Sequence, residues 1–481
     1  MRRSSLIVPV CLLALIAVLA SLGAAPARAA DPASADEGHW PSWRGPVGTG
    51  EAPGGDPPVE WSESKNVRFK VDVPGSGLGT PVVWGDRLYL TTAVPTGKKE
   101  QPEGGPTEVP EWMQGRGVQP EEILDFRVLA YDRMTGKLAW EQSAVKAVPH
   151  ESIHMDGSWA GASAVTDGEV VCASFGSQGI YCYTVEGKLL WSKDLGDMTT
   201  RNGFGEGASP ALHGDTLVVN WDHEGPSFIV ALDRMTGKEL WRKSRDEVTS
   251  WSTPMVVEAG GKRQVVVNAT DRVRAYDLAT GDVVWEVGGM TTNAIPSPVA
   301  DGELLFVTSG FRGNALVAVR LAKAKGDLTD VPAGEGAVAW RYDRDTPYVP
   351  SPLLYGGNLY ILKHNKGILS AFEAATGKVH YAERLDGVPG VYASPVAADG
   401  RIYIAGRDGT TVVLAAGPEL KVLAANELDD RFDASPAVVG DILYLRGHDH
   451  LYALESGAGK AEAGNEAAPK QASDKEVKKG R

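Results

Sequence analysis

Two short polar segments hold the residue types that bind metals or move protons. The segment WDHEG at 221–225 combines Asp, His and Glu, and GHDHL at 447–451 carries two His residues two positions apart. Neither has a strong metal-ligand spacing, so a metal site would need ligands from both, and solvated turns have the same composition. The sequence contains no G-x-S-x-G motif to support a Ser-His-Asp triad. We therefore assign no metal and no catalytic residue.

A second group of residues suits the binding of a polar organic ligand. Aromatic rings among Asn, Asp and Glu fit a sugar or a quinone, although rings at such places also fill channels without binding anything. The candidates for ligand binding are Asp156, Trp159, Asn202, Glu206, Asp222, His223, Trp251, Asn293, Tyr348, Tyr392 and Asp433. A carboxylate pair such as Asp156 and Glu206 also leaves glycan cleavage open.

These candidates belong to a repeated unit. The phrase DRMTGK with a following Trp occurs at 132–140 and again at 233–241, and weaker copies follow along the chain. A second phrase comes ahead of the copies. It consists of a small residue, usually followed by Pro, and then an apolar stretch and a Gly turn. These starts lie at 80–90, 163–173, 209–219, 253–267, 297–307, 351–361, 394–404 and 435–445. Spacings of 40 to 44 residues, with about four short apolar runs in each unit, are typical of β-propeller blades.

The last unit ends one strand early, at Leu454. The stretch VRFKVDVPG at 67–75 resembles the fourth strand of other units, so we expect it to complete the last blade and hide both sheet edges. The predicted fold is therefore all-β. It is an eight-bladed β-propeller of four-stranded antiparallel blades over residues 40–454, with the ring closed by an N-terminal strand.

The repeated phrase itself has a packing role. Asp132, Asp233 and Asp277 start a turn in which their carboxylates accept backbone N–H bonds, and a Gly closes that turn at positive φ. Four residues later a Trp begins the outer strand and fills the space between blades. The structural Trp residues of the repeat are Trp140, Trp191, Trp241, Trp285 and Trp340.

Propeller geometry directs attention to one face of the ring. The loops before each first strand and between strands two and three share this face, called here the loop-rich face, and the T-G turns lie on the opposite one. Six of the nine His residues fall in these loops, and the first blade carries a long polar insertion at 96–125. Because binding sites tend to lie in loops on a rigid scaffold, we expect a ligand at this face and at the mouth of the central channel.

The two ends of the chain differ from the repeats. Residues 1–29 combine a basic start, an apolar stretch and a small-residue cleavage site, which indicates a secretory signal peptide. Residues 30–39 form a short linker, and the polar tail at 455–481 is predicted to be disordered. We therefore expect an exported protein, periplasmic or extracellular, with no membrane span.

Charge and cysteine content narrow the partners. A net charge of −14 gives no electrostatic reason to bind nucleic acid or anionic lipid. Beyond residues 1–29 the cysteines are Cys172 and Cys182, without C-x-x-C or haem-attachment spacing. Two interpretations of this pair are open. The cysteines form a disulfide between neighbouring strands, or they are two small buried hydrophobic side chains without a bond.

The A-x-D-x-x-T-G-x-x-x-W phrase and the Ser-Pro of the blades resemble the repeat of the pyrroloquinoline-quinone (PQQ) propeller superfamily. WPSWRGPVGTG at 40–50 is similar to the opening of many exported members. The superfamily includes quinoprotein alcohol and glucose dehydrogenases. It also includes non-enzymatic relatives such as the propeller lipoprotein of the bacterial outer-membrane assembly machinery. In the dehydrogenases, PQQ stacks on a disulfide of two adjacent cysteines, beside a calcium ion held by Glu, Asn and Asp. This chain has no adjacent cysteine pair, so the resemblance implies the fold and we assign no cofactor.

Two functions from different classes follow. We expect an exported, monomeric binding or scaffold protein that engages a protein, peptide or glycan at the loop-rich face, without catalysis. The alternative is a PQQ- and calcium-dependent oxidoreductase of the alcohol or sugar dehydrogenase type, with the cofactor in the channel mouth.

Overall fold

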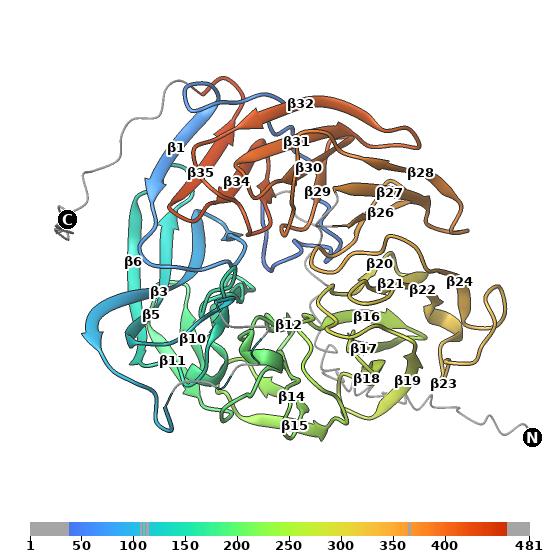
Figure 1. The fold of residues 1–481 in the computed structure, drawn as a ribbon, viewed down its shortest axis with the longest axis horizontal. Coiled ribbons are helices and arrows are strands. Elements are labelled where there is room, and N and C mark those ends of the chain that lie inside the picture. Colours follow the sequence, from blue (N-terminus) through green and yellow to red (C-terminus); the bar gives the residue numbers. More distant parts are fainter. Residues whose placement is uncertain (1–37, 106–107, 109–110, 112–114, 364–366, 459–481) are drawn as a thin grey trace, which may run out of the picture.

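The computed structural model describes residues 38–105, 108, 111, 115–363 and 367–458. The predicted signal peptide, most of the linker and all but the first four residues of the tail lie outside the described residues. The strands form a ring of eight sheets around a central axis (Figure 1). This confirms the eight-bladed propeller.

Each blade is an antiparallel sheet of four strands, numbered from the centre of the ring outward. Blade 1 has β2 (Val82–Trp84), β3 (Arg87–Lys99), β5 (Glu122–Asp132) and β6 (Leu138–Ala147). Blade 2 has β8 (Val165–Thr166), β9 (Val170–Ser174), β10 (Ile180–Thr184) and β11 (Leu189–Lys193). Blade 3 has β12 (Ala211–His213), β13 (Thr216–Trp221), β14 (Phe228–Asp233) and β15 (Glu239–Ser244). Blade 4 has β16 (Met255–Ala259), β17 (Lys262–Val267), β18 (Arg272–Asp277) and β19 (Val283–Gly288).

The other four blades repeat this order. Blade 5 has β20 (Val299–Ala300), β21 (Leu304–Ser309), β22 (Ala315–Arg320) and β24 (Val338–Tyr342). Blade 6 has β25 (Leu353–Tyr355), β26 (Asn358–Lys363), β27 (Ile368–Glu373) and β28 (Val379–Arg384). Blade 7 has β29 (Val396–Ala398), β30 (Arg401–Ala405), β31 (Thr410–Ala415) and β32 (Lys421–Glu427). Blade 8 has β33 (Ala437–Val439), β34 (Ile442–Arg446), β35 (His450–Glu455) and β1 (Val67–Asp72).

A few short elements lie outside this plan. Strand β23 (Gly326–Asp327) adds in parallel to β19, and β4 (Gly117–Val118) pairs with β7 (Ile153–His154). The described helices are single 3₁₀ turns: η2 (Gly176–Gln178), η3 (Arg201–Gly203) and η4 (Leu321–Lys323). Among the described residues, no helix has the length and apolar character needed to cross a membrane.

The ring is closed by the N-terminal strand, as predicted. Strand β1 pairs antiparallel with β35, with Val71 opposite Leu451 and Asp72 opposite His450. Figure 1 shows the two strands side by side, although they come from opposite ends of the chain. The closure leaves the last blade with a full set of strands and covers an edge that would otherwise expose unpaired backbone groups.

The Ser-Pro of the repeat forms an inner ring of hydrogen bonds. A backbone N–H ahead of one blade's first strand donates to the hydroxyl oxygen at the equivalent position of the next blade, at 2.8–3.1 Å. The residues joined in this order are Thr80, Ser163, Ser209, Thr253, Ser297, Ser351, Ser394 and Ser435. A small hydroxyl residue thus links each blade to the next, from blade 1 to blade 8, where the ring is narrowest.

The repeated Trp residues link the blades at the outside. The indole N–H of Trp140, Trp191, Trp241 and Trp340 donates to a backbone carbonyl of the following blade at 2.8–3.0 Å. Each of these rings also covers the Gly of the next blade's turn. At Gly237, for example, φ is +67° and an added Cβ would lie 2.6 Å from the Trp191 ring. The phrase is therefore a packing element.

Trp285 differs from the other four. Its indole N–H donates to the Gln264 side chain of its own blade at 3.0 Å. In the following blade the T-G turn is replaced by the excursion between β22 and β24, which contains η4 and β23. The carbonyl and the turn Gly that the other Trp residues contact are therefore missing from that position.

A disulfide joins Cys172 and Cys182 inside blade 2. The two residues lie opposite one another on β9 and β10, and both side chains are fully buried. They pack in an apolar cluster with Trp191 and Trp221.

Candidate functional site

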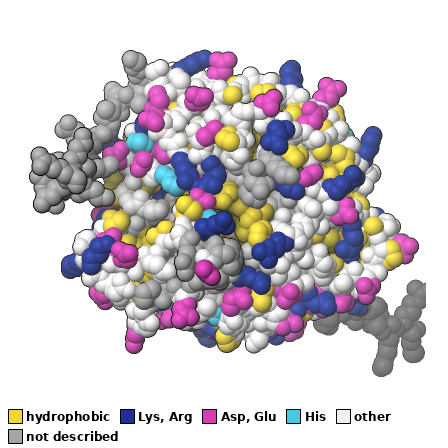
Figure 2. All heavy atoms as spheres, in the orientation of Figure 1, with side chains coloured by type: hydrophobic (Ala, Val, Ile, Leu, Met, Phe, Trp, Pro, Cys, Tyr) yellow, Lys and Arg dark blue, Asp and Glu magenta, His cyan; other side chains and the backbone are white. Residues whose placement is uncertain are grey.

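A cavity of about 850 Å³ opens at the centre of the loop-rich face. The loops that precede the first strands of all eight blades contribute to its wall, so it is the mouth of the central channel. Its volume lies in the range of ligand pockets, roughly 300–1,000 Å³. Basic and hydrophobic side chains lie around the middle of the ring in Figure 2.

Most of the candidate residues lie at this cavity. Those in its wall are Asp156, Asn202, Glu206, Trp251, Asn293, Tyr348, Tyr392 and Asp433. Trp159, Asp222 and His223 lie outside the wall. The indole N–H of Trp159 donates instead to the Glu151 carbonyl at 3.0 Å.

Asp222 and His223 have structural roles in blade 3, where Asp222 contacts the connection to blade 4 and His223 the connection from blade 2. The Asp222 carboxylate is fully buried, pairs with Arg245 at 2.6 and 3.0 Å, and accepts a hydrogen bond from Ser250 Oγ at 2.6 Å. The His223 ring accepts the Thr199 N–H through Nδ1 at 3.1 Å, and burial lowers the pKa of this His. Neither side chain is directed toward a ligand-sized space.

The two aspartates of the cavity are neutralised by arginines. Asp156, from the loop before blade 2, accepts from Arg407 at 2.5 Å and from Arg431 at 2.8 Å. The same arginines contact Asp433 at 2.6 and 3.1 Å, and His448 Nε2 lies 2.9 Å from it. These ion pairs connect blade 2 with blades 7 and 8 across the mouth.

Tyr392 lies against this ion-pair network. The Arg407 guanidinium carbon lies 3.9 Å from the centre of the Tyr392 ring, and burial raises the pKa of this Tyr to about 12. Its hydroxyl donates to Asp156 at 3.3 Å. The Tyr392 hydroxyl is therefore neutral at physiological pH. It serves as a hydrogen-bond donor and not as a catalytic base.

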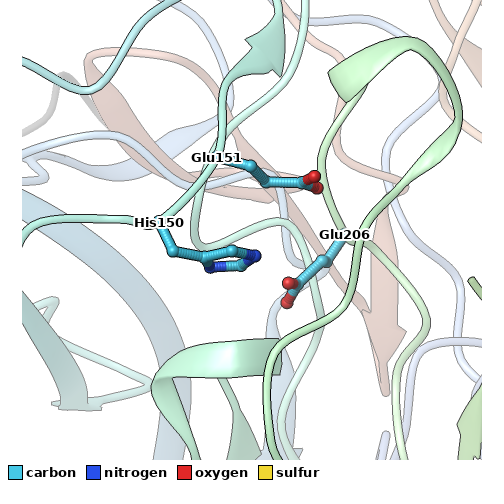
Figure 3. Close-up of side chains that lie close together, drawn as sticks. All are labelled: His150, Glu151 and Glu206. Atoms are coloured by element: carbon cyan, nitrogen blue, oxygen red, sulfur yellow. The ribbon is translucent and has the colours of Figure 1, made fainter. Parts of the chain in front are cut away.

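Glu206 belongs to a second acidic group, shown in Figure 3 with His150 and Glu151. One ligand atom of each residue lies within 4.8 Å of the ligand atoms of the other two. Among the described residues, these three therefore form a cluster with the geometry to hold a metal ion. Both carboxylates nevertheless already have protein partners, and His150 has one through Nε2, while its buried Nδ1 has none among the described residues. Glu206 accepts the N–H and hydroxyl hydrogens of Ser177, and His150 Nε2 donates to a backbone carbonyl at 2.7 Å. We therefore assign no metal to the cluster.

Burial governs the charge of these two glutamates. It raises the pKa of Glu206 to about 7 and also raises the pKa of Glu151. Glu151 accepts the N–H and the hydroxyl hydrogen of Thr200 at 3.0 and 2.6 Å. The cluster therefore fastens three loops together and carries less negative charge than its composition suggests.

The N-terminal stretch 40–50 contributes Trp43 to the wall of the cavity. Trp43 lines the cavity and donates its indole N–H to Ser435 Oγ at 3.3 Å. The buried Arg44 guanidinium donates to the carbonyls of Thr49, Pro352 and Pro395 at 2.8–3.0 Å, and burial lowers its pKa to about 9. A second cavity of about 860 Å³, at the other end of the channel, shares Trp43 in its wall. The stretch thus separates two spaces.

Sequence reasoning missed several residues of this site. Arg116, Arg201 and Arg312 line the cavity, as does Trp43, and Glu151 and His150 support Glu206. Trp43 and Arg44 were visible as part of the 40–50 motif. The three arginines have no common position in the repeat, so the sequence offered no signal for them.

The wall does not fit PQQ and calcium as the dehydrogenases hold them. The disulfide lies within blade 2, is fully buried and contributes no residue to the wall. Among the described wall residues, Asp156 and Asp433 are held by arginines, and Glu206 is held by Ser177. Each described carboxylate of the wall thus already has a protein partner.

Fold and site define an eight-bladed β-propeller with a ligand-sized cavity at one mouth of its channel. A family model described as "Outer membrane protein assembly factor BamB" matches residues 124–286 and 225–462. These matches cover most of the propeller. The chain belongs to this family of PQQ-like β-propellers.

Individual relatives are more distant. An outer membrane protein assembly factor BamB of Moranella endobia is 24% identical over 246 residues, which are 47% of this chain and 58% of the relative. One of Francisella salina is 32% identical over 92 residues, 19% of this chain and 16% of the relative. The chain therefore spans less than two thirds of the curated relatives that it matches.

Solved structures agree on the fold. The crystal structure of BamB from Moraxella catarrhalis has a TM-score of 0.54 and 14% identity, covering 80% of this chain and 98% of that one. A quinohemoprotein alcohol dehydrogenase from Pseudomonas putida HK5 also has a TM-score of 0.54, with 12% identity, covering 90% and 82%. At these identities the likeness shows the fold alone.

Proposed function

We propose that this protein is an exported binding scaffold that holds a segment of a partner protein at the loop-rich face, over the central cavity. One observation carries the proposal. The cavity is large enough for a ligand, and its described acids Asp156, Asp433 and Glu206 are each held by protein partners that position loops. The family supports it, because its description names an outer membrane assembly factor.

Export is part of the proposal. Residues 1–29 have the pattern of a secretory signal. The Cys172–Cys182 disulfide supports an oxidising compartment, because disulfides are rare in the cytosol.

Site-specific photo-crosslinking tests the scaffold function. Met155 is 58% exposed and stands between His154 and Asp156, which both line the cavity. A benzoylphenylalanine at Met155, in cells that produce the protein, should give an adduct with one defined protein. That protein, once identified and purified, should bind the scaffold in vitro.

The matched control position is Leu240, which is 50% exposed at the start of the outer strand of blade 3, next to a T-G turn. We expect no such adduct from Leu240. Failure at Met155, or the same adduct at both positions, would contradict a partner at the loop-rich face.

The alternative function is a PQQ-dependent oxidoreductase, and it has a direct test. The purified protein is titrated with PQQ and calcium, and alcohol or sugar oxidation is followed with a dye acceptor. We expect neither stoichiometric quinone binding nor turnover. Turnover would overturn the scaffold proposal in favour of the enzyme.

A further inference from the structure

Arg116, Arg201 and Arg312 line the cavity, and no acidic side chain among the described residues forms an ion pair with them. We infer that they receive the carboxylates of an acidic peptide segment, so that Arg116, Arg201 and Arg312 select the partner. The inference rests on the proposed function, because it states the chemistry that the partner's segment must carry.

The three arginines come from separate parts of the ring. Arg116 stands just before β4 in the insertion of blade 1, Arg201 begins η3 ahead of blade 3, and Arg312 lies between β21 and β22 in blade 5. Within the described part of the chain, none of them has a carboxylate oxygen within 4 Å, whereas Arg407 and Arg431 each contact two aspartates. The cavity therefore holds more positive charge than its own acids neutralise.

This local excess runs against the charge of the whole protein. The chain carries a net charge of −14, yet the aspartates of the cavity are paired and burial raises the pKa of Glu206 to about 7. Guanidinium groups in a partly enclosed space attract anions more strongly than groups in open water. The planar fork of Arg matches a carboxylate in two hydrogen bonds. The cavity is thus complementary to an anion.

The backbone at the cavity supports a binding role. Asn202, Asn293 and Arg312 have φ values of +59°, +59° and +52°, and they are half of the described non-glycine residues with positive φ. Such conformations cost free energy, for Arg more than for Asn, and they concentrate at functional sites. The positive φ of Arg312 is an unfavourable backbone conformation. A role in ligand binding would explain why this conformation is kept at the cavity.

The apolar residues favour a peptide over a glycan. Phe311 and Tyr348 stack with ring centres 4.7 Å apart at one side of the cavity. Next to Arg116 and the cavity mouth, Val118 is 42% and Met155 58% exposed. A peptide offers both carboxylates and apolar side chains to such a surface, whereas a glycan would leave the aliphatic groups uncovered.

Calorimetric titration with designed peptides tests the inference. The acidic probe is the capped peptide acetyl-GEFEFEG-amide, and its matched control is acetyl-GQFQFQG-amide, which lacks only the charges. We expect the acidic peptide to bind at least about tenfold more tightly, with an affinity that falls as salt is raised. Equal binding of both peptides, or of neither, would overturn the inference.

A third probe separates two sources of the carboxylate. The same Gln-containing peptide with a free C-terminal carboxylate tests for recognition of a chain end. Binding of this peptide alongside the acidic one supports the inference and adds the chain end as a source. Binding of trigalacturonate in place of all three peptides would overturn it in favour of an acidic glycan.

The protein variants assign the effect to the three arginines. The variant Arg116→Gln, Arg201→Gln, Arg312→Gln should bind the acidic peptide about 30-fold or more weakly. The control Lys137→Gln, Lys188→Gln, Lys238→Gln removes the same charge from exposed residues of the turns on the opposite face and should bind like the unmodified protein. An equal loss in both variants, or in neither, would contradict the assignment.

The two proposals can fail separately. If the partner captured through Met155 binds the triple arginine variant as well as the unmodified protein, the acidic segment is wrong and the scaffold function stands. If no partner is captured but the acidic peptide binds through the arginines, the cavity has the inferred chemistry for a ligand other than a partner protein.

Discussion

The backbone N–H of Ser351 donates a hydrogen bond to the hydroxyl oxygen of Ser394 at 2.9 Å, and both residues are 1% exposed. This bond joins blade 6 to blade 7 next to the central channel. Equivalent bonds join the other neighbouring blades from blade 1 to blade 8, so a residue that looks like a sequence marker of the repeat holds the ring together at its centre.

Removing one of these hydroxyls should destabilise the ring. Ser394→Ala leaves the buried Ser351 N–H without an acceptor, and we expect the free energy of unfolding to fall by about 1–2 kcal/mol. Ser394→Thr is the matched control, because Thr253 already serves as an acceptor in the equivalent place, at 3.1 Å. Chemical denaturation measures both variants. A loss for Thr as large as the loss for Ala would show that shape, and not the hydrogen bond, determines stability here.

The close packing of the repeated Trp rings against the turn glycines gives a second prediction. At Gly237 an added Cβ meets the Trp191 ring at 2.6 Å, whereas at Gly214 nothing lies within 4 Å, and both residues have positive φ. Gly214→Ala should therefore cost only the backbone strain, about 1 kcal/mol, and Gly237→Ala about 3 kcal/mol or more. The difference in unfolding free energy between the two variants isolates the contact with Trp. Equal losses would mean that Trp191 can shift freely.

The repeat made the fold predictable, and it also explains which parts of the site were predictable. A position just before a first strand converges on the channel in every blade, and this geometry brought Asn202, Trp251 and Asp433 to the cavity. The carboxylate of Asp222 suits a ligand-binding site. In the structure, however, it forms an ion pair with the buried Arg245. A pairing between loops of this kind depends on side-chain packing that no periodic pattern encodes.

The cationic part of the cavity could not be predicted for a related reason. The significance of Arg312 lies in the absence of a nearby acid among the described residues, and a sequence shows which residues exist but not which remain unpaired. The pairing of Arg407 with Asp156 connects positions 251 residues apart. Only the three-dimensional arrangement distinguishes the arginines that neutralise aspartates from those that face the cavity.

Glu206 should make stability depend on pH. Burial raises its pKa to about 7 in the folded protein, above the value of roughly 4.3 in an unfolded chain. Its protonated form therefore favours folding at low pH, and that contribution is lost as pH rises from about 4.5 through 7. Glu206→Gln imitates the protonated state. We expect it to be more stable than the unmodified protein by about 1–2 kcal/mol at pH 8, and by much less at pH 5. Denaturation curves that run parallel across this pH range would contradict the assignment.

The Cys172–Cys182 disulfide should stabilise blade 2 in an oxidising compartment. The bridge spans ten residues, and a loop of that length is expected to contribute about 2–3 kcal/mol by restricting the unfolded chain. The double variant Cys172→Ala, Cys182→Ala should lose that amount in chemical denaturation. The unmodified protein with the bond reduced should then be close to the double variant in stability, because Ala retains most of the apolar packing around β9 and β10. Reduction without any effect on unfolding would mean that the apolar cluster alone holds this blade.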